Sequence, residues 1–216
     1  VIVFIALLPF SGDIFTLVSE PLRSVLPGNA MIATAVASPL LTPFKLTFFT
    51  ALFIVMPIVL FQIWNFIAPG LYKKEKRFAI PLLMTSILLF YCGIAFAYFV
   101  VFPLMFGFFV SIAPAGVEMQ TDITQFLDFI TTIVFAFGIA FEVPVATVLI
   151  VWAGLTNTEK LAKARPYVFL MAFIAGMFLT PPDVISQTLL AVPVYLLFEL
   201  GIIMSKVFVN KKSDDE

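Results

Sequence analysis

Long uninterrupted apolar runs constrain the fold of this chain more than any other feature. Five of them follow one another along the sequence, at residues 46–68, 78–110, 129–152, 168–179 and 188–209. A bilayer core about 30 Å thick requires on the order of 20 apolar residues in a helix, and a helix pairs its own backbone polar groups there. The sequence therefore predicts an all-α membrane protein.

The composition supports lipid as the solvent of this chain. Hydrophobic residues make up 62% of the 216 residues and charged residues only 12%. Soluble domains contain about 45–50% apolar and about 25% charged residues, and disordered chains are poorer still in apolar residues. The net charge of −1 excludes the global basic field that attracts nucleic acid.

Two apolar runs are shorter than a membrane span. The chain begins within an apolar run, residues 1–10, and we interpret this run as the remnant of a first span whose natural start is missing. Residues 168–179 would form a helix of only about 18 Å, at 1.5 Å per residue. That helix must thin the membrane, extend into flanking polar residues or re-enter on the same side. Counting both runs, the sequence predicts six helices.

The positive residues predict the orientation of these helices. Ten of the twelve Lys and Arg residues lie in loops that alternate on one side, and the positive-inside rule assigns that side to the cytoplasm. Only two positive residues, Arg23 and Lys45, lie on the opposite side. Because six is an even number, both chain termini are expected in the cytoplasm, including the tail at 210–216. The ten residues are Lys73, Lys74, Lys76, Arg77, Lys160, Lys163, Arg165, Lys206, Lys211 and Lys212.

Prolines shape the rest of the predicted fold. The segment 11–45 carries four prolines and much apolar surface, and we expect it to lie on the outer face as a periplasmic cap. Prolines inside spans withdraw backbone donors and bend membrane helices. The prediction is a single domain, a six-helix transmembrane bundle with a truncated first helix, concave, with bent helices. The prolines in the spans are Pro57, Pro81, Pro103, Pro144 and Pro193.

Glu142 is the most informative single residue, because it lies near the middle of the apolar run 129–152. An ionised carboxylate at that depth is costly and requires a partner, a water-filled cavity or protonation. Two interpretations stay open. Either Glu142 has a functional role, or it makes an interhelical hydrogen bond to Gln or Ser that only holds the bundle together.

Two loops carry further candidates. Glu75 is the lone acid in the basic loop 69–77, where a solvated and locally neutralised charge is the ordinary interpretation. On the opposite side, Pro181 and Pro182 fix an extended turn, and Asp183 is placed to cap a helix that begins just after it.

Catalytic and cofactor chemistry has few candidate residues here. The chain has no His and a single cysteine, Cys92, which excludes histidine triads, disulfide frameworks and thiolate metal clusters. It contains no Gly-rich phosphate loop. An intramembrane protease would need paired Asp, or Ser with His, within the spans. We therefore expect a protein that is not an enzyme and needs no cofactor or metal.

Three motifs mark the loops and spans: Phe66-Ile67-Ala68-Pro69-Gly70-Leu71-Tyr72-Lys73-Lys74-Glu75, Phe141-Glu142-Val143-Pro144 and Thr180-Pro181-Pro182-Asp183. Together with Ser38-Pro39, Phe44-Lys45 and the six-span order, they resemble the TatC family, the multispanning subunit of the twin-arginine protein translocase. The resemblance covers nearly the whole chain. The family's short cytoplasmic N-terminal segment and most of its first span have no counterpart in this sequence.

The resemblance implies a core receptor in the bacterial inner membrane that binds the Arg-Arg signal peptides of folded precursor proteins. It also implies that the receptor nucleates the translocation complex and is driven by the proton-motive force. By position, Glu75 would receive the paired arginines in a bidentate contact, with Phe66 beside it. Glu142 would meet the inserted signal peptide or a partner helix. Gln187 and Pro21 would contact partner proteins. The implied partners are the single-span subunits TatA and TatB, further copies of this chain and the lipid bilayer. Nucleic acid is not an expected partner.

Two other function classes compete. A proton-coupled small-solute transporter would also need a midplane carboxyl and broken helices, but it predicts two corresponding halves, and Glu142 has no counterpart in the first three spans. A membrane scaffold would use every candidate residue for structure alone. Substitution of Glu75 separates receptor from scaffold if precursor binding is lost while the protein stays abundant in the membrane.

Overall fold

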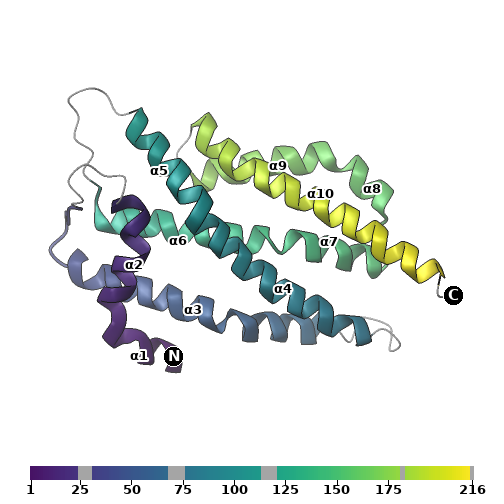
Figure 1. The fold of residues 1–216 in the computed structure, drawn as a ribbon, viewed down its shortest axis with the longest axis horizontal. Helices are drawn as coiled ribbons and strands as arrows, with labels where there is room; N and C mark the ends of the chain where they lie inside the picture. Colours follow the sequence, from purple (N-terminus) through teal and green to yellow (C-terminus); the bar gives the residue numbers. More distant parts are fainter. Residues whose placement is uncertain (24–30, 68–75, 113–120, 181–182, 215–216) are drawn as a thin grey trace. The chain divides into compact units, whose positions relative to one another are not determined.

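The computed structural model describes residues 1–23, 31–67, 76–112, 121–180 and 183–214, and helices account for most of them. Within these ranges the structure contains no strand, only one isolated β-bridge between Ile32 and Asp122, so the predicted all-α class is confirmed (Figure 1). The elements in chain order are α1 (Ile2–Leu7), the 3₁₀ turn η1 (Leu8–Phe10), α2 (Ser11–Arg23), α3 (Ser38–Ile67), α4 (Lys76–Phe96), the π-helix η4 (Ala97–Val101), α5 (Phe102–Ser111), α6 (Ile123–Ala140), α7 (Val143–Trp152), α8 (Thr158–Lys163), α9 (Arg165–Leu179) and α10 (Val184–Asp214).

Five helical runs in the described part of the chain are long and apolar enough to cross a membrane. A sixth apolar helix, Arg165–Leu179, is shorter. It begins three residues before the predicted run 168–179, so the helix extends into its polar flank. The five runs are Ile2–Glu20, Ser38–Asn65, Ile80–Ser111, Ile123–Trp152 and Val184–Val207.

The N-terminal part differs most from the sequence-based expectation. The helical run continues through residue 10 to Glu20, because Pro9 sits at the start of a 3₁₀ turn, a position where its missing N–H costs no helical bond. The next helix begins at Ser38, within the segment 11–45 assigned to a cap. The division into spans and cap, and the concave form, stay predictions.

Two prolines coincide with irregular backbone. The π-helix Ala97–Val101 ends two residues before Pro103, whose missing N–H removes one α-helical hydrogen bond from this turn. Pro144 lies in the first turn of α7, directly after a two-residue break between α6 and α7. The expectation of bent helices is met at these two positions.

The chain forms two compact units, and α3, α4 and α6 each contribute residues to both. The first unit consists of residues 1–59 and 95–134. Within it, α2 packs against α5, and the Tyr98 hydroxyl donates a hydrogen bond to the Leu17 carbonyl at 2.8 Å. The ring centroid of Phe106 lies 5.8 Å from that of Phe126, a distance at which aromatic rings attract each other.

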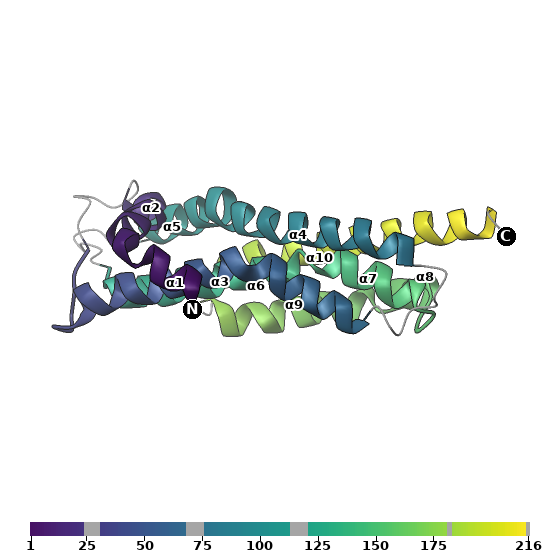
Figure 2. The same cartoon turned by 90° about the horizontal axis from the view of Figure 1, so that it is seen from below.

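The second unit consists of residues 60–94 and 135–216. Its longest helix, α10, packs along α7 and α9 (Figure 1 and Figure 2). The contact with α7 is close because Gly201 has no side chain: a Cβ atom there would lie 2.8 Å from the side chain of Thr147. An apolar cluster completes this unit, formed by Trp64, Leu82, Val145 and Val148.

Candidate functional site

Glu142 lies in the break between α6 and α7, in the second unit. Its backbone N–H donates to the Ile139 carbonyl at 3.0 Å, and its own carbonyl accepts from the Ala146 N–H at 2.8 Å. The backbone is thus paired through the break, although Pro144 contributes no N–H. The Glu142 side chain does not cap α7, so its carboxyl is directed to other partners.

One of those partners is Ser86 on α4. The Ser86 hydroxyl donates to Oε2 of Glu142 at 2.5 Å, and Ser86 is only 1% exposed. The other carboxyl oxygen, Oε1, is buried and has no hydrogen-bond partner among the described residues. The interhelical bond to Ser is the structural interpretation that the sequence left open, but it engages only half of the carboxyl.

Close packing of α4 on α6 brings these two residues together. A Cβ atom on Gly93 would lie 2.5 Å from the Phe137 carbonyl oxygen, and one on Gly138 would lie 2.7 Å from the ring of Phe90. Neither position tolerates a side chain without a shift. The antiparallel register that pairs Gly93 with Phe137 and Phe90 with Gly138 places Ser86 opposite Glu142.

An ion pair joins α9 to α10 in the same unit. The Arg165 Nε and Nη2 atoms donate to Oε1 and Oε2 of Glu199 at 2.7 and 2.8 Å. This fork geometry is the strong form of an Arg–carboxylate contact. The partners are 34 residues apart in the sequence, which gives no local signal of the pairing.

A polar network surrounds the start of α6 in the first unit. Oδ2 of Asp122 accepts from the Thr34 N–H at 2.9 Å and from the Thr34 hydroxyl at 2.7 Å, and Oδ1 accepts from the N–H groups of Thr124 and Gln125 at 2.8 and 3.2 Å. The Thr34 hydroxyl contributes most to lowering the pKa of Asp122 to about 2, since all these donors favour the carboxylate. Asp122 therefore ties the segment before α3 to the first turn of α6.

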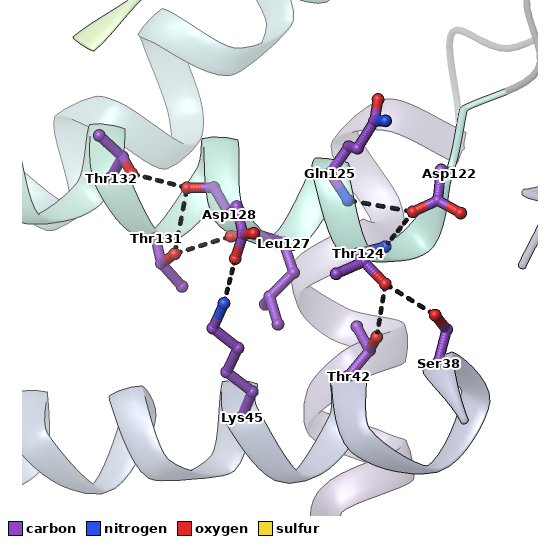
Figure 3. A network of polar contacts seen from close by, with 10 residues as sticks. All are labelled: Ser38, Thr42, Lys45, Asp122, Thr124, Gln125, Leu127, Asp128, Thr131 and Thr132. Atoms are coloured by element: carbon purple, nitrogen blue, oxygen red, sulfur yellow. Dashed lines mark hydrogen bonds and ion pairs between the residues drawn. The ribbon is translucent and has the colours of Figure 1, made fainter. Parts of the chain in front are cut away.

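The same network links α6 directly to α3 (Figure 3). The Thr124 hydroxyl donates to the Ser38 hydroxyl at 2.9 Å and lies 3.4 Å from the Thr42 hydroxyl. One turn farther along, Lys45 forms an ion pair with Asp128. These contacts are structural in character, and the sequence did not predict them because each joins residues more than 80 positions apart.

Asp183 and Gln187 lie at the start of α10. Oδ1 of Asp183 accepts from the Ser186 N–H at 2.7 Å, so Asp183 caps the helix as the sequence predicts. Its second oxygen, Oδ2, and the Ser186 hydroxyl are buried without a hydrogen-bond partner in the described part of the chain. The Gln187 Cα atom would lie 3.6 Å from a Cβ atom on Gly176, so α9 and α10 approach closely here.

The remaining predicted site residues lie either outside the described ranges or at helix ends whose side chains are not described. Glu75, Pro181 and Pro182 fall outside the described residues. Phe66 and Pro21 lie near the C-terminal ends of α3 and α2, where the positions of the side chains are not described. The assignment of Glu75 and Phe66 to a signal-peptide site stays a prediction.

Comparison with known proteins connects these features to one family. The model of the family described as Sec-independent protein translocase protein (TatC) matches residues 1–193. A Sec-independent protein translocase protein TatC from Azotobacter chroococcum mcd 1 is 62% identical over 202 residues, which cover 93% of this chain and 79% of the relative. That of Escherichia coli K12 is 55% identical over 217 residues, covering 100% of this chain and 84% of the relative. A solved crystal structure of the twin-arginine translocase receptor TatC superposes with a TM-score of 0.84 at 34% identity, covering 95% of this chain and 92% of that one.

Proposed function

This chain belongs to the TatC family of Sec-independent protein translocases, and we propose that it is the signal-peptide receptor of a twin-arginine translocase. The five long apolar helices and the family together make it a multi-pass membrane protein. In the proposal it binds the Arg-Arg signal peptides of folded precursor proteins and nucleates the translocation complex. It acts by binding rather than by covalent catalysis, and the proton-motive force supplies the energy.

The observation that carries this proposal is the agreement in fold with a solved twin-arginine translocase receptor. A TM-score of 0.84 over 95% of this chain at 34% identity supports the same helical fold along nearly the whole chain. An inserted helix could also meet Glu142 in the break between α6 and α7, where one carboxyl oxygen has no hydrogen-bond partner among the residues that the structure describes. The chemistry thus supports binding of a helix within the membrane.

The proposed docking site for the paired arginines is Glu75, with Phe66 beside it. A guanidinium group binds a carboxylate through two parallel hydrogen bonds, which an ammonium group cannot reproduce. The basic residues around Glu75 set the topology and contact lipid headgroups. This arrangement would distinguish an Arg-Arg from a Lys-Lys signal peptide, although both carry the same charge.

The proposed assembly lies in the bacterial inner membrane, with both termini of this chain in the cytoplasm. Its further members are the single-span subunits TatA and TatB and additional copies of this chain. Gln187 and Pro21 are the proposed partner contacts. Gln187 lies in the first turns of α10, beside buried polar atoms of Asp183 and Ser186 that have no partner within the described ranges, which supports a polar contact there.

Site-specific photo-crosslinking tests the receptor function. A photoreactive amino acid replaces Phe66 in the chain in bacterial membranes, and the precursor carries either an Arg-Arg signal peptide or its Lys-Lys twin. We expect crosslinks to the Arg-Arg precursor alone, and at least about a tenfold loss in a Glu75→Gln variant, since hydrogen bonds to charged groups contribute about 1.5–3 kcal/mol.

The matched control is Glu159→Gln. Glu159 is an exposed acid in the first turn of α8, in a loop assigned to the same side of the membrane. This variant should crosslink like the parent chain. Equal labelling of the two precursors, or none from a protein that remains abundant in the membrane, would favour the transporter or scaffold class.

A further inference from the structure

We propose that Ser86 is a positioning residue, which orients the Glu142 carboxyl as a hydrogen-bond acceptor for a partner helix within the membrane. The partner is identified by its chemistry: an apolar transmembrane helix that carries one amide or hydroxyl donor at the depth of Glu142. The inference rests on the proposed role of Glu142 as an intramembrane contact, and it adds a residue that none of the three sequence motifs contains.

The hydrogen bond itself is the first support. Ser86 is 1% exposed, so no bulk solvent competes for its hydroxyl, which donates to Oε2 of Glu142 at 2.5 Å. A distance of 2.5 Å lies at the short end of the range for O–H···O hydrogen bonds. This hydrogen bond engages Oε2 of Glu142 and thereby fixes the position of Oε1.

The packing around the pair is the second support. The close approach at Gly93 and Gly138 fixes how α4 crosses α6 and therefore holds the Ser86 backbone in place. Glu142 lies in the two-residue break between α6 and α7, with its backbone N–H and carbonyl both hydrogen-bonded. Both backbones are thus held in place, and the hydrogen bond from Ser86 sets the direction of the Glu142 carboxyl.

The unpaired oxygen is the third support. Oε1 of Glu142 is buried without a hydrogen-bond partner among the described residues, and a buried acceptor without a donor destabilises the structure that contains it. Glu142 as a whole is only partly buried, and Ile139, three residues earlier on the same helical face, is 55% exposed. A helix that packs on Ile139 would bring an amide or hydroxyl donor toward this carboxyl.

Crosslinking from Ile139 tests the role of Ser86. A photoreactive amino acid replaces Ile139 in the chain, which is expressed with TatA and TatB, and labelling of each subunit is measured in membranes. We expect labelling to fall in Glu142→Ala, to fall by about fivefold in Ser86→Ala, the size of one net hydrogen bond, and to recover in Ser86→Thr, which retains the hydroxyl.

Ser205→Ala is the matched control. Ser205 is also 1% exposed, but its hydroxyl donates to the Gly201 carbonyl of its own helix at 2.7 Å. This variant should label like the parent chain. Equal losses in Ser86→Ala and Ser205→Ala would overturn the inference, because the effect would then reflect the loss of any buried hydroxyl.

Infrared spectroscopy of the purified chain in lipid nanodiscs provides a second readout. The carboxyl band that disappears in Glu142→Gln belongs to Glu142. It should shift in Ser86→Ala and return in Ser86→Thr, whereas a serine with a general packing role would leave it in place.

The outcomes distinguish the role of Glu142 from that of Ser86. If Glu142→Ala labels like the parent chain, the role of Glu142 as a partner contact fails. If Glu142→Ala loses labelling but Ser86→Ala does not, or if the infrared band is the same in Ser86→Ala, the inference about Ser86 fails and the proposed function stands.

Discussion

Arg165 on α9 and Glu199 on α10 form a bidentate ion pair with donor–acceptor distances of 2.7 and 2.8 Å. The pair ties the short apolar helix α9 to the longest helix of the second unit, and both elements also pack through the T-shaped contact of Phe169 with Tyr195 at 5.5 Å between ring centroids. A short helix has little surface to hold it, so this contact at its first residue restrains the end of α9.

We predict that Arg165→Lys lowers the thermal stability of the detergent-solubilised protein and that Arg165→Ala lowers it further. Lys preserves the charge but cannot form the two parallel bonds, and Ala leaves the partly buried Glu199 without this partner. Melting temperatures from tryptophan fluorescence measure the order. Lys160→Ala, a change at an exposed cation on α8, serves as the control, and equal melting temperatures for Arg165→Lys and the parent chain would contradict the prediction.

Asp122 makes the stability of the first unit depend on acid pH. Its pKa is lowered to about 2 from an ordinary value of 3.8, first by the Thr34 hydroxyl and then by backbone N–H groups. A group whose pKa is depressed in the folded state stabilises that state fully above its unfolded pKa, and this contribution is lost as the pH falls toward the folded pKa.

We therefore predict that Asp122→Asn lowers the melting temperature near pH 6 and that the difference from the parent chain shrinks between pH 3.8 and about 2. Thermal unfolding in detergent across this range measures it. Asp13→Asn, at an exposed carboxylate in the first turn of α2, is the comparison. A difference that stays constant down to pH 2 would show that Asp122 acts without its charge.

Gly93 offers a test of the α4–α6 crossing. A Cβ atom there would meet the Phe137 carbonyl oxygen at 2.5 Å, and backbone cannot move aside as a side chain can. We predict that Gly93→Ala destabilises the protein by about 1–3 kcal/mol, the usual cost of overpacking. At Gly107 no described atom beyond its chain neighbours and the adjoining backbone of its own helix lies within 4 Å of such a Cβ, so Gly107→Ala should be neutral or stabilising by up to about 1 kcal/mol. Equilibrium unfolding in mixed detergent compares the two.

Substitution of Glu142 separates its functional from its structural role. We predict that Glu142→Ala reduces export of an Arg-Arg precursor to about a tenth or less, since removal of one partner of a buried hydrogen bond costs about 1–3 kcal/mol, while the protein remains abundant in the membrane. Glu142→Gln keeps an acceptor for Ser86 but presents an amide in place of the second oxygen, and it should also export poorly. Normal export by Glu142→Gln with unchanged partner contacts would exclude the proposed role.

The helices were predictable because a lipid solvent leaves few alternatives. Each of the six apolar runs overlaps one apolar helical segment of the structure, and its depth in the run 129–152 marks Glu142 as unusual. The sequence does not predict the start of α3 at Ser38, although Ser followed by Pro is common where a helix begins. The four prolines and the apolar content of the segment 11–45 favour a cap on the outer face instead.

The sequence does not predict which polar residues form hydrogen bonds or ion pairs with one another. Ser86 is an ordinary Ser in an apolar run, and only the register set by Gly93 and Gly138 places it against Glu142. Arg165 resembled a topology-setting cation, yet it pairs with Glu199. Such contacts depend on how helices cross, and hydrophobic periodicity does not determine the crossing.

The π-helix at Ala97–Val101 has a consequence for the helical phase of α5. A π turn contains one residue more than an α turn, and one residue corresponds to a rotation of about 100° about the helix axis. Phe102, Met105 and Phe106, which are buried, face the interior of the first unit only because that extra residue precedes them. Deletion of one residue here would preserve helicity and hydropathy, yet it would turn the aromatic face of α5 out of register with Phe126.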